Sequence, residues 1–221
     1  MTPAKARIML VDDHAMVRHG IATLINAQAD MEVFGEAGTV DDAVSMIKPD
    51  KHPDLVLIDL SLSGVSGFEL LKKLHLRFPA LPTLVVSMYD ESEYAERALR
   101  AGARGYVMKQ EVLDVLLVAI RRVLAGKIYL SEAMGSRLLE RMATDGAVPD
   151  PPINRLTPAE FEVLHLIGAG NTSQEISELL HRSIKTIEAH RANIRKKLQL
   201  NEGADLNRFA AEWLKGGGKP E

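Results

Sequence analysis

The sequence predicts an α/β domain with a flavodoxin-like, doubly wound sheet of five parallel strands, followed by a small all-α domain of four helices. In the first half of the chain, short continuous apolar runs alternate with longer segments of helical periodicity. That alternation is typical of a parallel sheet covered on both faces by helices. From residue 154 onward only helical patterns remain, so we expect a separate helical domain there.

The five predicted strands are the apolar runs over residues 8–11, 31–37, 55–58, 83–86 and 105–108. Helical spacing fills the segments between them, as in Val17, Ile21, Leu24 and Ile25. The last helix of this domain covers residues 112–123, and Gly126 is a suitable helix stop. We therefore place the first domain at residues 1–128, with functional groups expected beyond the carboxyl ends of the strands.

A linker is predicted over residues 129–153, with a short helix over 131–142 and a segment rich in Gly, Pro and Asp over 143–152. The final domain, residues 154–221, contains two capping boxes, at 157–160 and 172–175. A third helix is predicted from the expected cap Ser183 to Leu198, and a fourth covers residues 204–214. The short spacing between the second and third helices is that of a helix-turn-helix.

The composition narrows the possible chemistry. The 221 residues include no cysteine, which excludes disulfides, cysteine nucleophiles and cysteine-ligated metal sites. No uninterrupted apolar run approaches about 18 residues, so we expect a cytoplasmic protein that does not enter a membrane. The net charge is −3, but residues 181–198 are strongly basic, which indicates either a nucleic-acid contact or a solvated helix face.

Polar side chains follow the apolar runs where the predicted strands end. Asp12 and Asp13 follow the first strand, Asp59 the third, Ser87 the fourth and Lys109 the fifth. Because crowded carboxylates repel one another they need a cation, and an oxygen-rich site suits Mg²⁺. A carboxylate beside Mg²⁺ can attack phosphorus and form an acyl phosphate, while an amine and a hydroxyl hold the oxygens of the transferred group. The pattern therefore predicts a phosphoacceptor site.

Over residues 6–126 the chain resembles the receiver domains of bacterial response regulators. The resemblance is carried by Val-Asp-Asp-His at 11–14, Leu-Ile-Asp-Leu at 57–60, Gly67, Val-Ser-Met-Tyr-Asp at 86–90, Ala-Gly-Ala at 101–103 and Gly-Tyr-Val-Met-Lys at 105–109. It implies that Asp59 accepts a phosphoryl group from a histidine kinase, and that Mg²⁺ binds Asp12, Asp13, Asp59 and the Ser61 carbonyl. It further implies that Ser87 and Tyr106 form a switch pair and that Lys109 contacts the phosphate.

One departure from the receiver pattern follows the phosphoacceptor. Leu62 and Ser63 stand where the family commonly has Met-Pro. Losing the proline frees a backbone N–H and loosens the loop, and Gly64 and Gly67 add conformational freedom. We expect phosphotransfer to survive this change and the lifetime of the phosphorylated state to be affected.

The third helix of the final domain has the pattern of a major-groove recognition helix. Projected at 3.6 residues per turn, it turns Ile187, Ile194 and Leu198 inward. Its outward face and two flanks carry the expected DNA contacts, namely Lys185, Thr186, Glu188, Ala189, His190, Arg191, Ala192, Asn193, Arg195, Lys196 and Lys197. Small outward residues let a helix approach base edges, and basic flanks meet phosphates. Glu188 either contacts a cytosine amino group or pairs with Arg191 or Lys185 on the helix surface.

Residues 154–214 resemble the LuxR-type helix-turn-helix, on the evidence of Leu-Thr-Pro-Ala-Glu at 156–160, Glu-Ile-Ser at 175–177 and residues 185–198. Ala159 stands where that family usually has Arg. The domain order is similar to the NarL/FixJ class of regulators. The resemblance implies a phosphorylation-dependent transcriptional regulator that binds double-stranded DNA and forms a homodimer when phosphorylated or on DNA. Part of the face formed by Phe209, Ala210, Trp213 and Leu214 should be domain core, and the remainder is available for pairing.

Two other function classes remain to be compared. A phosphatase or hydrolase that used Asp59 as its nucleophile would generally need a second acid nearby. The residue two positions after Asp59 is Ser61, which argues against this class. A pure docking module would predict decay of the acidic pocket or of the basic helix, and both are intact. We therefore expect no enzymatic turnover beyond phosphoacceptor chemistry and slow self-dephosphorylation.

Overall fold

A computed structural model describes residues 4–48, 50–62, 66–111, 113–143, 152–200 and 203–215. The chain divides into two compact units, Met1–Met142 and Ala143–Glu221. Most of the predicted Gly-, Pro- and Asp-rich segment, residues 144–151, lies outside the described residues. None of the helices in the described ranges is long and apolar enough to cross a membrane.

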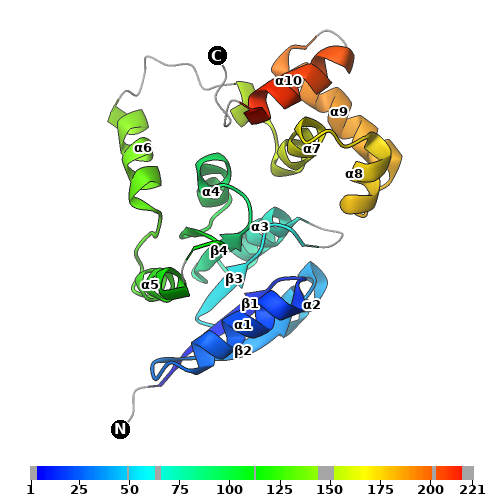
Figure 1. Ribbon diagram of the computed structural model, residues 1–221. Coiled ribbons are helices and arrows are strands. Elements are labelled where there is room, and N and C mark those ends of the chain that lie inside the picture. The colour runs from blue at the N-terminus through cyan, green and yellow to red at the C-terminus, as the bar shows by residue number, and fades with distance from the viewer. Residues whose placement is uncertain are drawn as a thin grey trace. The chain divides into compact units, whose positions relative to one another are not determined.

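The first unit is built on a five-stranded parallel sheet with the order β2-β1-β3-β4-β5 (Figure 1). The strands are β1 (Ala6–Val11), β2 (Met31–Ala37), β3 (Leu55–Ile58), β4 (Thr83–Ser87) and β5 (Tyr106–Met108). These are the predicted strands, except that β1 begins at Ala6 rather than Ile8, β4 extends to Ser87 and β5 begins at Tyr106 rather than Gly105. Because the order reverses at β1, the carboxyl ends of β1 and β3 are neighbours at a topological switch point.

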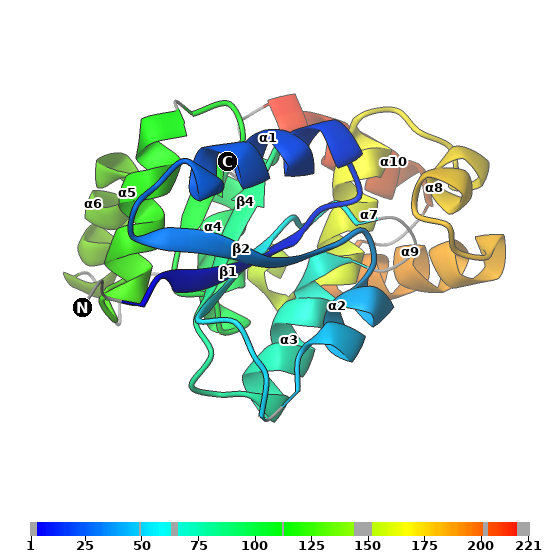
Figure 2. The same cartoon turned by 90° about the horizontal axis from the view of Figure 1, so that it is seen from below.

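Helices cover both faces of this sheet. The first unit contains α1 (Ala15–Asn26), α2 (Val40–Met46), α3 (Gly67–Arg77), α4 (Glu91–Arg100), α5 (Leu113–Leu124) and α6 (Glu132–Ala143). Helix α1 lies on one side of the sheet, and α2 and α3 lie on the other (Figure 2). On the α1 side, Ile25 and Ile120 are fully buried against strand residues such as Leu57. Burial on both faces explains why the strands are continuous apolar runs rather than alternating ones.

Gly67 has a packing role that differs from the flexibility predicted for it. It is the first residue of α3, and its amide donates to the Leu60 carbonyl at 3.0 Å. A Cβ at this position would overlap the Asp59 carbonyl oxygen and come within 2.8 Å of the Leu60 Cα. The absent side chain therefore lets α3 begin directly against the loop that carries Asp59. Of the other residues of the predicted loose loop, Leu62 is buried, and Ser63 and Gly64 lie outside the described residues.

In its described residues, 152–200 and 203–215, the second unit contains a 3₁₀ turn, η1 (Pro152–Arg155), and four helices. These are α7 (Pro158–Gly168), α8 (Ser173–Leu179), α9 (Ile184–Leu198) and α10 (Gly203–Lys215). Both predicted capping boxes are present, with Thr157 and Glu160 at α7 and with Thr172 and Glu175 at α8. Ser183 caps α9, so four residues separate α8 from α9, as the helix-turn-helix prediction required.

Trp213 belongs to the core of the second unit. It is 4% exposed, and its ring packs edge-on against Phe161 with centroids 5.2 Å apart. Ala210, one turn earlier in α10, is fully buried, and its carbonyl lies so close to Gly168 that a Cβ there would come within 2.6 Å. The apolar face of α10 thus packs mainly against α7. The part of this face that was predicted to be domain core is therefore core.

Replacing Gly67 by Ala should lower the free energy of unfolding of the first unit by about 1–3 kcal/mol, because the new methyl group overlaps backbone atoms that cannot move independently. Far-UV circular dichroism during denaturant unfolding of the full chain measures this change. Gly20 in α1 is the matched control, since nothing lies within 4 Å of its Cβ position. Gly20→Ala should raise stability by about 0.5–1 kcal/mol. Equal effects of the two substitutions would show that Gly67 has no packing role.

Candidate functional site

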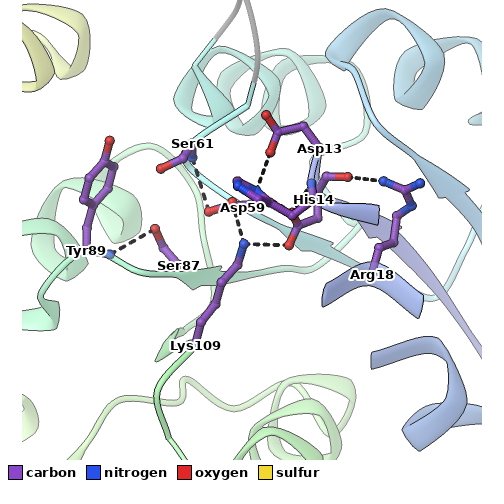
Figure 3. Close-up of polar contacts among 9 residues, drawn as sticks. Asp13, His14, Arg18, Asp59, Ser61, Ser87, Tyr89 and Lys109 are labelled. Carbon is purple, nitrogen blue, oxygen red and sulfur yellow. Dashed lines mark hydrogen bonds and ion pairs between the residues drawn. The ribbon is translucent and has the colours of Figure 1, made fainter. Parts of the chain in front are cut away.

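Asp59 and Lys109 form a close ion pair at the carboxyl edge of the sheet (Figure 3). Asp59 follows β3 and Lys109 follows β5, and the parallel order brings both strand ends to the same edge. Lys109 Nζ lies 2.6 Å from Asp59 Oδ2 and 2.6 Å from Asp12 Oδ2. The other oxygen of Asp59, Oδ1, accepts a hydrogen bond from the Ser61 amide at 3.2 Å. The Asp12, Asp59 and Lys109 side chains are all buried.

Asp13 and His14 complete the rim of this pocket. One ligand atom from each of Asp12, Asp13, His14 and Asp59 lies within 4.8 Å of the others. The His14 ring nitrogen Nδ1 is 2.8 Å from Asp13 Oδ1, and the His14 amide donates to Asp12 Oδ1 at 2.8 Å. Arg18 donates to the Asp12 carbonyl from α1. The sequence prediction included neither His14 nor Arg18, although His14 directly follows the acidic pair.

The protonation of the pocket is governed by burial and by the lysine. Burial raises the pKa of Asp59, and the adjacent Lys109 ammonium acts against that increase. Burial would lower the pKa of Lys109, but the carboxylates of Asp59 and Asp12 outweigh it and raise this pKa, so the ammonium stays protonated. Two carboxylates share the Lys109 ammonium, and a third, that of Asp13, lies within a few ångströms of them, so the oxygens gathered here suit a divalent cation.

Ser87 and Tyr106 both bind the backbone of one residue, Tyr89. Ser87 Oγ accepts from the Tyr89 amide at 3.4 Å, and the Tyr106 hydroxyl donates to the Tyr89 carbonyl at 3.0 Å. Both side chains are fully buried, and burial raises the pKa of the Tyr106 phenol, which keeps it a donor. The sequence pattern could not identify Tyr89 because it contributes main-chain atoms to this contact.

Helix α9 presents the faces that its sequence predicted. Ile187 and Ile194 are fully buried and Leu198 is 8% exposed. Five exposed residues form the opposite face: Lys185, Glu188, Ala189, Ala192 and Lys196. On the flanks, Asn193 is exposed, while Thr186, His190, Arg195 and Lys197 are half-buried. The outward face therefore combines two lysines with two small residues, as a helix entering a groove requires.

Arg191 and Lys197 differ from the phosphate contacts that the sequence suggested. Arg191 is 9% exposed, and its Nη2 donates to Asn207 of α10 at 2.9 Å. Lys197 Nζ donates to the buried Glu160 of α7 at 2.6 Å. Burial would raise the pKa of Glu160, but its bonds to Lys197 and to Thr157 hold it below the usual value. Both cations thus connect helices within the second unit, a use that depends on residues distant in sequence.

Glu188 and His190 also have neighbours within the unit. Glu188 Oε1 accepts a hydrogen bond from the Ser173 hydroxyl of α8, and it lies 3.9 Å from Arg191 Nε. Glu188 is therefore paired with Arg191 on the helix surface, which is one of its two predicted roles, although its side chain is still half exposed. Burial and the nearby Arg182 lower the pKa of His190, so its ring is neutral near pH 7 and does not add positive charge to the helix.

Two family models match the chain. The "Response regulator receiver domain" matches residues 8–121, and "Bacterial regulatory proteins, luxR family" matches residues 154–210. The oxygen regulatory protein NreC of Staphylococcus haemolyticus is 35% identical over 209 residues, covering 92% of this chain and 96% of the relative. NreC of Staphylococcus aureus is 36% identical with the same coverage.

Solved structures agree with these matches. RcsB from Salmonella enterica bound to a promoter has a TM-score of 0.63 at 26% identity, and the match covers 94% of this chain and 99% of RcsB. A LuxR-family response regulator from Aurantimonas has a TM-score of 0.58 at 34% identity, covering 63% of this chain and 99% of that one. The chain belongs to the two-component response regulators of the NarL/FixJ class, which are transcription regulators with a receiver domain and a LuxR-type DNA-binding domain.

Arg191→Ala should destabilise the second unit by about 1–3 kcal/mol, because it removes a buried charged donor and the packing of its side chain. Trp213 is the only tryptophan and lies in that core, so its fluorescence during denaturation reports this unit. Lys185→Ala, an exposed change on the same helix, is the control and should leave the transition unchanged. If Arg191→Ala unfolds like the wild type, Arg191 has no stabilising role in this unit and remains a candidate DNA contact.

Proposed function

We propose that Asp59 is the phosphoacceptor of this regulator, with a sensor histidine kinase as donor. In the transfer, an Asp59 carboxylate oxygen attacks phosphorus, the P–N bond of the phosphohistidine breaks, and the electron pair stays on the imidazole. The observation that carries the proposal is the buried Asp59 beside Lys109. An ammonium 2.6 Å from the carboxylate can stabilise the negative charge on the oxygens of the phosphoryl group during transfer. After transfer, Lys109 Nζ can move from the carboxylate to a phosphoryl oxygen without leaving the pocket.

Mg²⁺ fits this pocket. Its preferred ligands are oxygens, and the carboxylates of Asp12, Asp13 and Asp59 supply them within a few ångströms of one another. The Ser61 carbonyl is the fourth protein ligand that the receiver resemblance implies. When bound, Mg²⁺ neutralises the acidic cluster and the charge of the incoming phosphoryl group. The His14 nitrogen is the softer donor at this rim, so we assign it no place among the Mg²⁺ ligands.

The switch pair supports a route from phosphorylation to a change in conformation. The Ser87 hydroxyl can turn from the Tyr89 amide toward a phosphoryl oxygen, and Tyr106 can fill the space that this movement leaves. Such a shift selects one of two pre-existing states, because both arrangements use the same buried side chains. We propose no turnover of an external substrate, since the residue two positions after Asp59 is Ser61, which cannot serve as a general acid at neutral pH.

The second unit is proposed to bind double-stranded DNA through the exposed face of α9. Lys185 and Lys196 supply phosphate contacts, and Ala189 and Ala192 let the backbone approach base edges. Because bacterial DNA lies in the cytoplasm, we place the regulator there.

We also propose that the DNA-bound form is a homodimer, since one small recognition helix makes few base contacts. A related structure contains two RcsB dimers on two parallel DNAs, at 27% identity to this chain. Among the described side chains of α10, Trp213 and Ala210 are committed to the core, whereas Asn207, Arg208 and Glu212 are exposed. A dimer contact through α10 would therefore be more polar than its sequence pattern suggested.

Incubation of the full chain with acetyl phosphate and Mg²⁺ should add one phosphoryl group. Acetyl phosphate, like phosphohistidine, carries a phosphoryl group bonded to a good leaving group. Intact-mass spectrometry measures the addition, which chelation of Mg²⁺ should abolish. Asp59→Asn should remain unmodified, and Asp54→Asn, an acid at the opposite end of β3, should be modified like the wild type. Labelling of Asp59→Asn to the wild-type extent would assign the phosphate elsewhere.

Lys185→Ala and Lys196→Ala should each weaken binding to all DNA sequences and reduce the slope of log affinity against log salt by about 1. Ala189→Ser should instead change the preferred sequence, because it alters the surface that meets base edges. Fluorescence anisotropy titrations of the full chain over a range of salt concentrations measure both effects. Sedimentation of the complex should show two chains per DNA, and a single chain at full affinity would contradict the dimer.

A further inference from the structure

Helix α6 begins at Glu132, directly after its cap residue Ser131, and a carboxylate from another helix completes its first turn. Ser131 Oγ accepts a hydrogen bond from the Met134 amide at 3.1 Å, which makes Ser131 the N-cap residue. The Ser131 amide donates to Glu91 Oε1 at 2.9 Å, and Glu91 is the first residue of α4. Glu91 is only 7% exposed, so its carboxylate is held between the two helix ends.

The capping boxes of the second unit show what is different about α6. The Thr157 amide donates to Glu160 Oε2 at 2.7 Å, and the Thr172 amide donates to Glu175 Oε2 at 2.7 Å. In both cases the acid belongs to the same helix, three residues after the cap. Helix α6 has Met134 at this position, a buried side chain that offers no carboxylate. Glu91 supplies the missing acceptor, so the first turn of α6 depends on the position of α4.

The start of α4 is in turn held by the switch pair. Glu91 lies two residues after Tyr89, whose amide and carbonyl bind Ser87 and Tyr106. Asp90, between them, is the N-cap of α4 and accepts from the Ser92 amide at 2.8 Å. A movement of the Tyr89 backbone must therefore pass directly to Glu91, because no flexible segment separates them.

A second connection joins the segment before α6 to the switch. The Tyr106 amide donates to the Tyr129 carbonyl at 3.1 Å, and the Tyr129 amide donates to the Arg104 carbonyl at 3.0 Å. Gly105 permits this approach, since a Cβ there would come within 2.7 Å of the Tyr129 carbonyl oxygen. Within α6 itself, Arg137 Nη1 donates to the Ser92 carbonyl of α4 at 3.3 Å. The chain leading toward the second unit is thus attached both to β5 and to the first turn of α4.

We propose that Glu91 is a positioning residue that couples the phosphorylation pocket to α6 by capping that helix from α4. The inference rests on the proposed phosphorylation of Asp59. When the Ser87 hydroxyl turns to the phosphoryl group, the hydrogen bond between Ser87 and the Tyr89 amide breaks and the start of α4 shifts. The Ser131 amide then loses the Glu91 carboxylate, and the first turn of α6 loosens. The state of the pocket reaches the connection to the DNA-binding unit through this hydrogen bond.

Hydrogen exchange of the full chain over residues 131–138, followed by mass spectrometry, tests the cap. Glu91→Ala should accelerate exchange there about tenfold without phosphorylation, as expected for loss of a helix cap. Glu91→Gln keeps a side-chain oxygen that can accept from the Ser131 amide, so it should exchange like the wild type. Glu132→Ala is the matched control, because it removes an exposed acid from the same turn without touching that amide.

Phosphorylation by acetyl phosphate with Mg²⁺ should accelerate exchange over residues 131–138 in the wild type. In Glu91→Ala, phosphorylation should not accelerate this exchange any further. Intact mass, recorded on the same samples, shows how much protein is phosphorylated. If the wild type is phosphorylated and exchange there does not change, the coupling is refuted while the proposed function stands. If no phosphoryl group is added, the proposed function fails, and the comparison of Glu91→Ala with Glu91→Gln still decides the cap. Equal exchange in those two variants would refute it.

DNA affinity provides the functional readout. Glu91→Ala should bind DNA more tightly than the wild type before phosphorylation, so that the ratio of affinities with and without acetyl phosphate falls toward one. Glu91→Gln should restore the wild-type ratio, a rescue that a general loss of stability would not give. An unchanged ratio in Glu91→Ala would show that the cap stabilises α6 without transmitting the signal.

Discussion

The receiver depends on the burial of two carboxylates and one ammonium at the carboxyl edge of its sheet, with a third carboxylate at the rim. The parallel order forces the ends of β1, β3 and β5 to this edge, and burial of Asp12, Asp59 and Lys109 removes much of the water that would separate their charges. Burying charges is costly unless they are paired, and here the two buried carboxylates of Asp12 and Asp59 share one ammonium. That imbalance suits the pocket to accept a cation first and an anionic group afterwards.

Most of the fold could be predicted because its signals are local. The strand runs, the capping boxes at Thr157 and Thr172, and the inward residues of α9 all follow from periodicity within one element. The pocket residues could be named because parallel topology converts strand ends into neighbours. What the sequence did not reveal is the use of a side chain by a distant segment. Arg191 binds Asn207, and Gly67 is needed by the Asp59 loop rather than for flexibility.

Helix α9 must satisfy two requirements with one set of basic residues. Its outward lysines are free for a nucleic-acid backbone, whereas Arg191 and Lys197 hold α10 and α7 in place. Leaving the buried Arg191 or the buried Glu160 without its partner is costly, so these contacts give the helix a defined orientation in a small domain whose apolar core is limited. The number of lysines and arginines in a basic segment can therefore exceed the number whose charges are available to bind DNA. Here their partners within the unit, Glu160 and Asn207, decide which cations remain available.

Helices α6, α7 and α8 each begin with a capping hydroxyl and a carboxylate that accepts from the cap amide, but they differ in how independent they are. Helices α7 and α8 contain both the capping hydroxyl and the returning carboxylate, so each can form its first turn from its own sequence. Helix α6 supplies only the hydroxyl of Ser131 and takes its carboxylate from α4. This dependence gives a physical reason for α6 to belong to the first compact unit, although its sequence follows the end of the sheet domain. A helix that needs a neighbour to begin can report the position of that neighbour, which an independently capped helix cannot do.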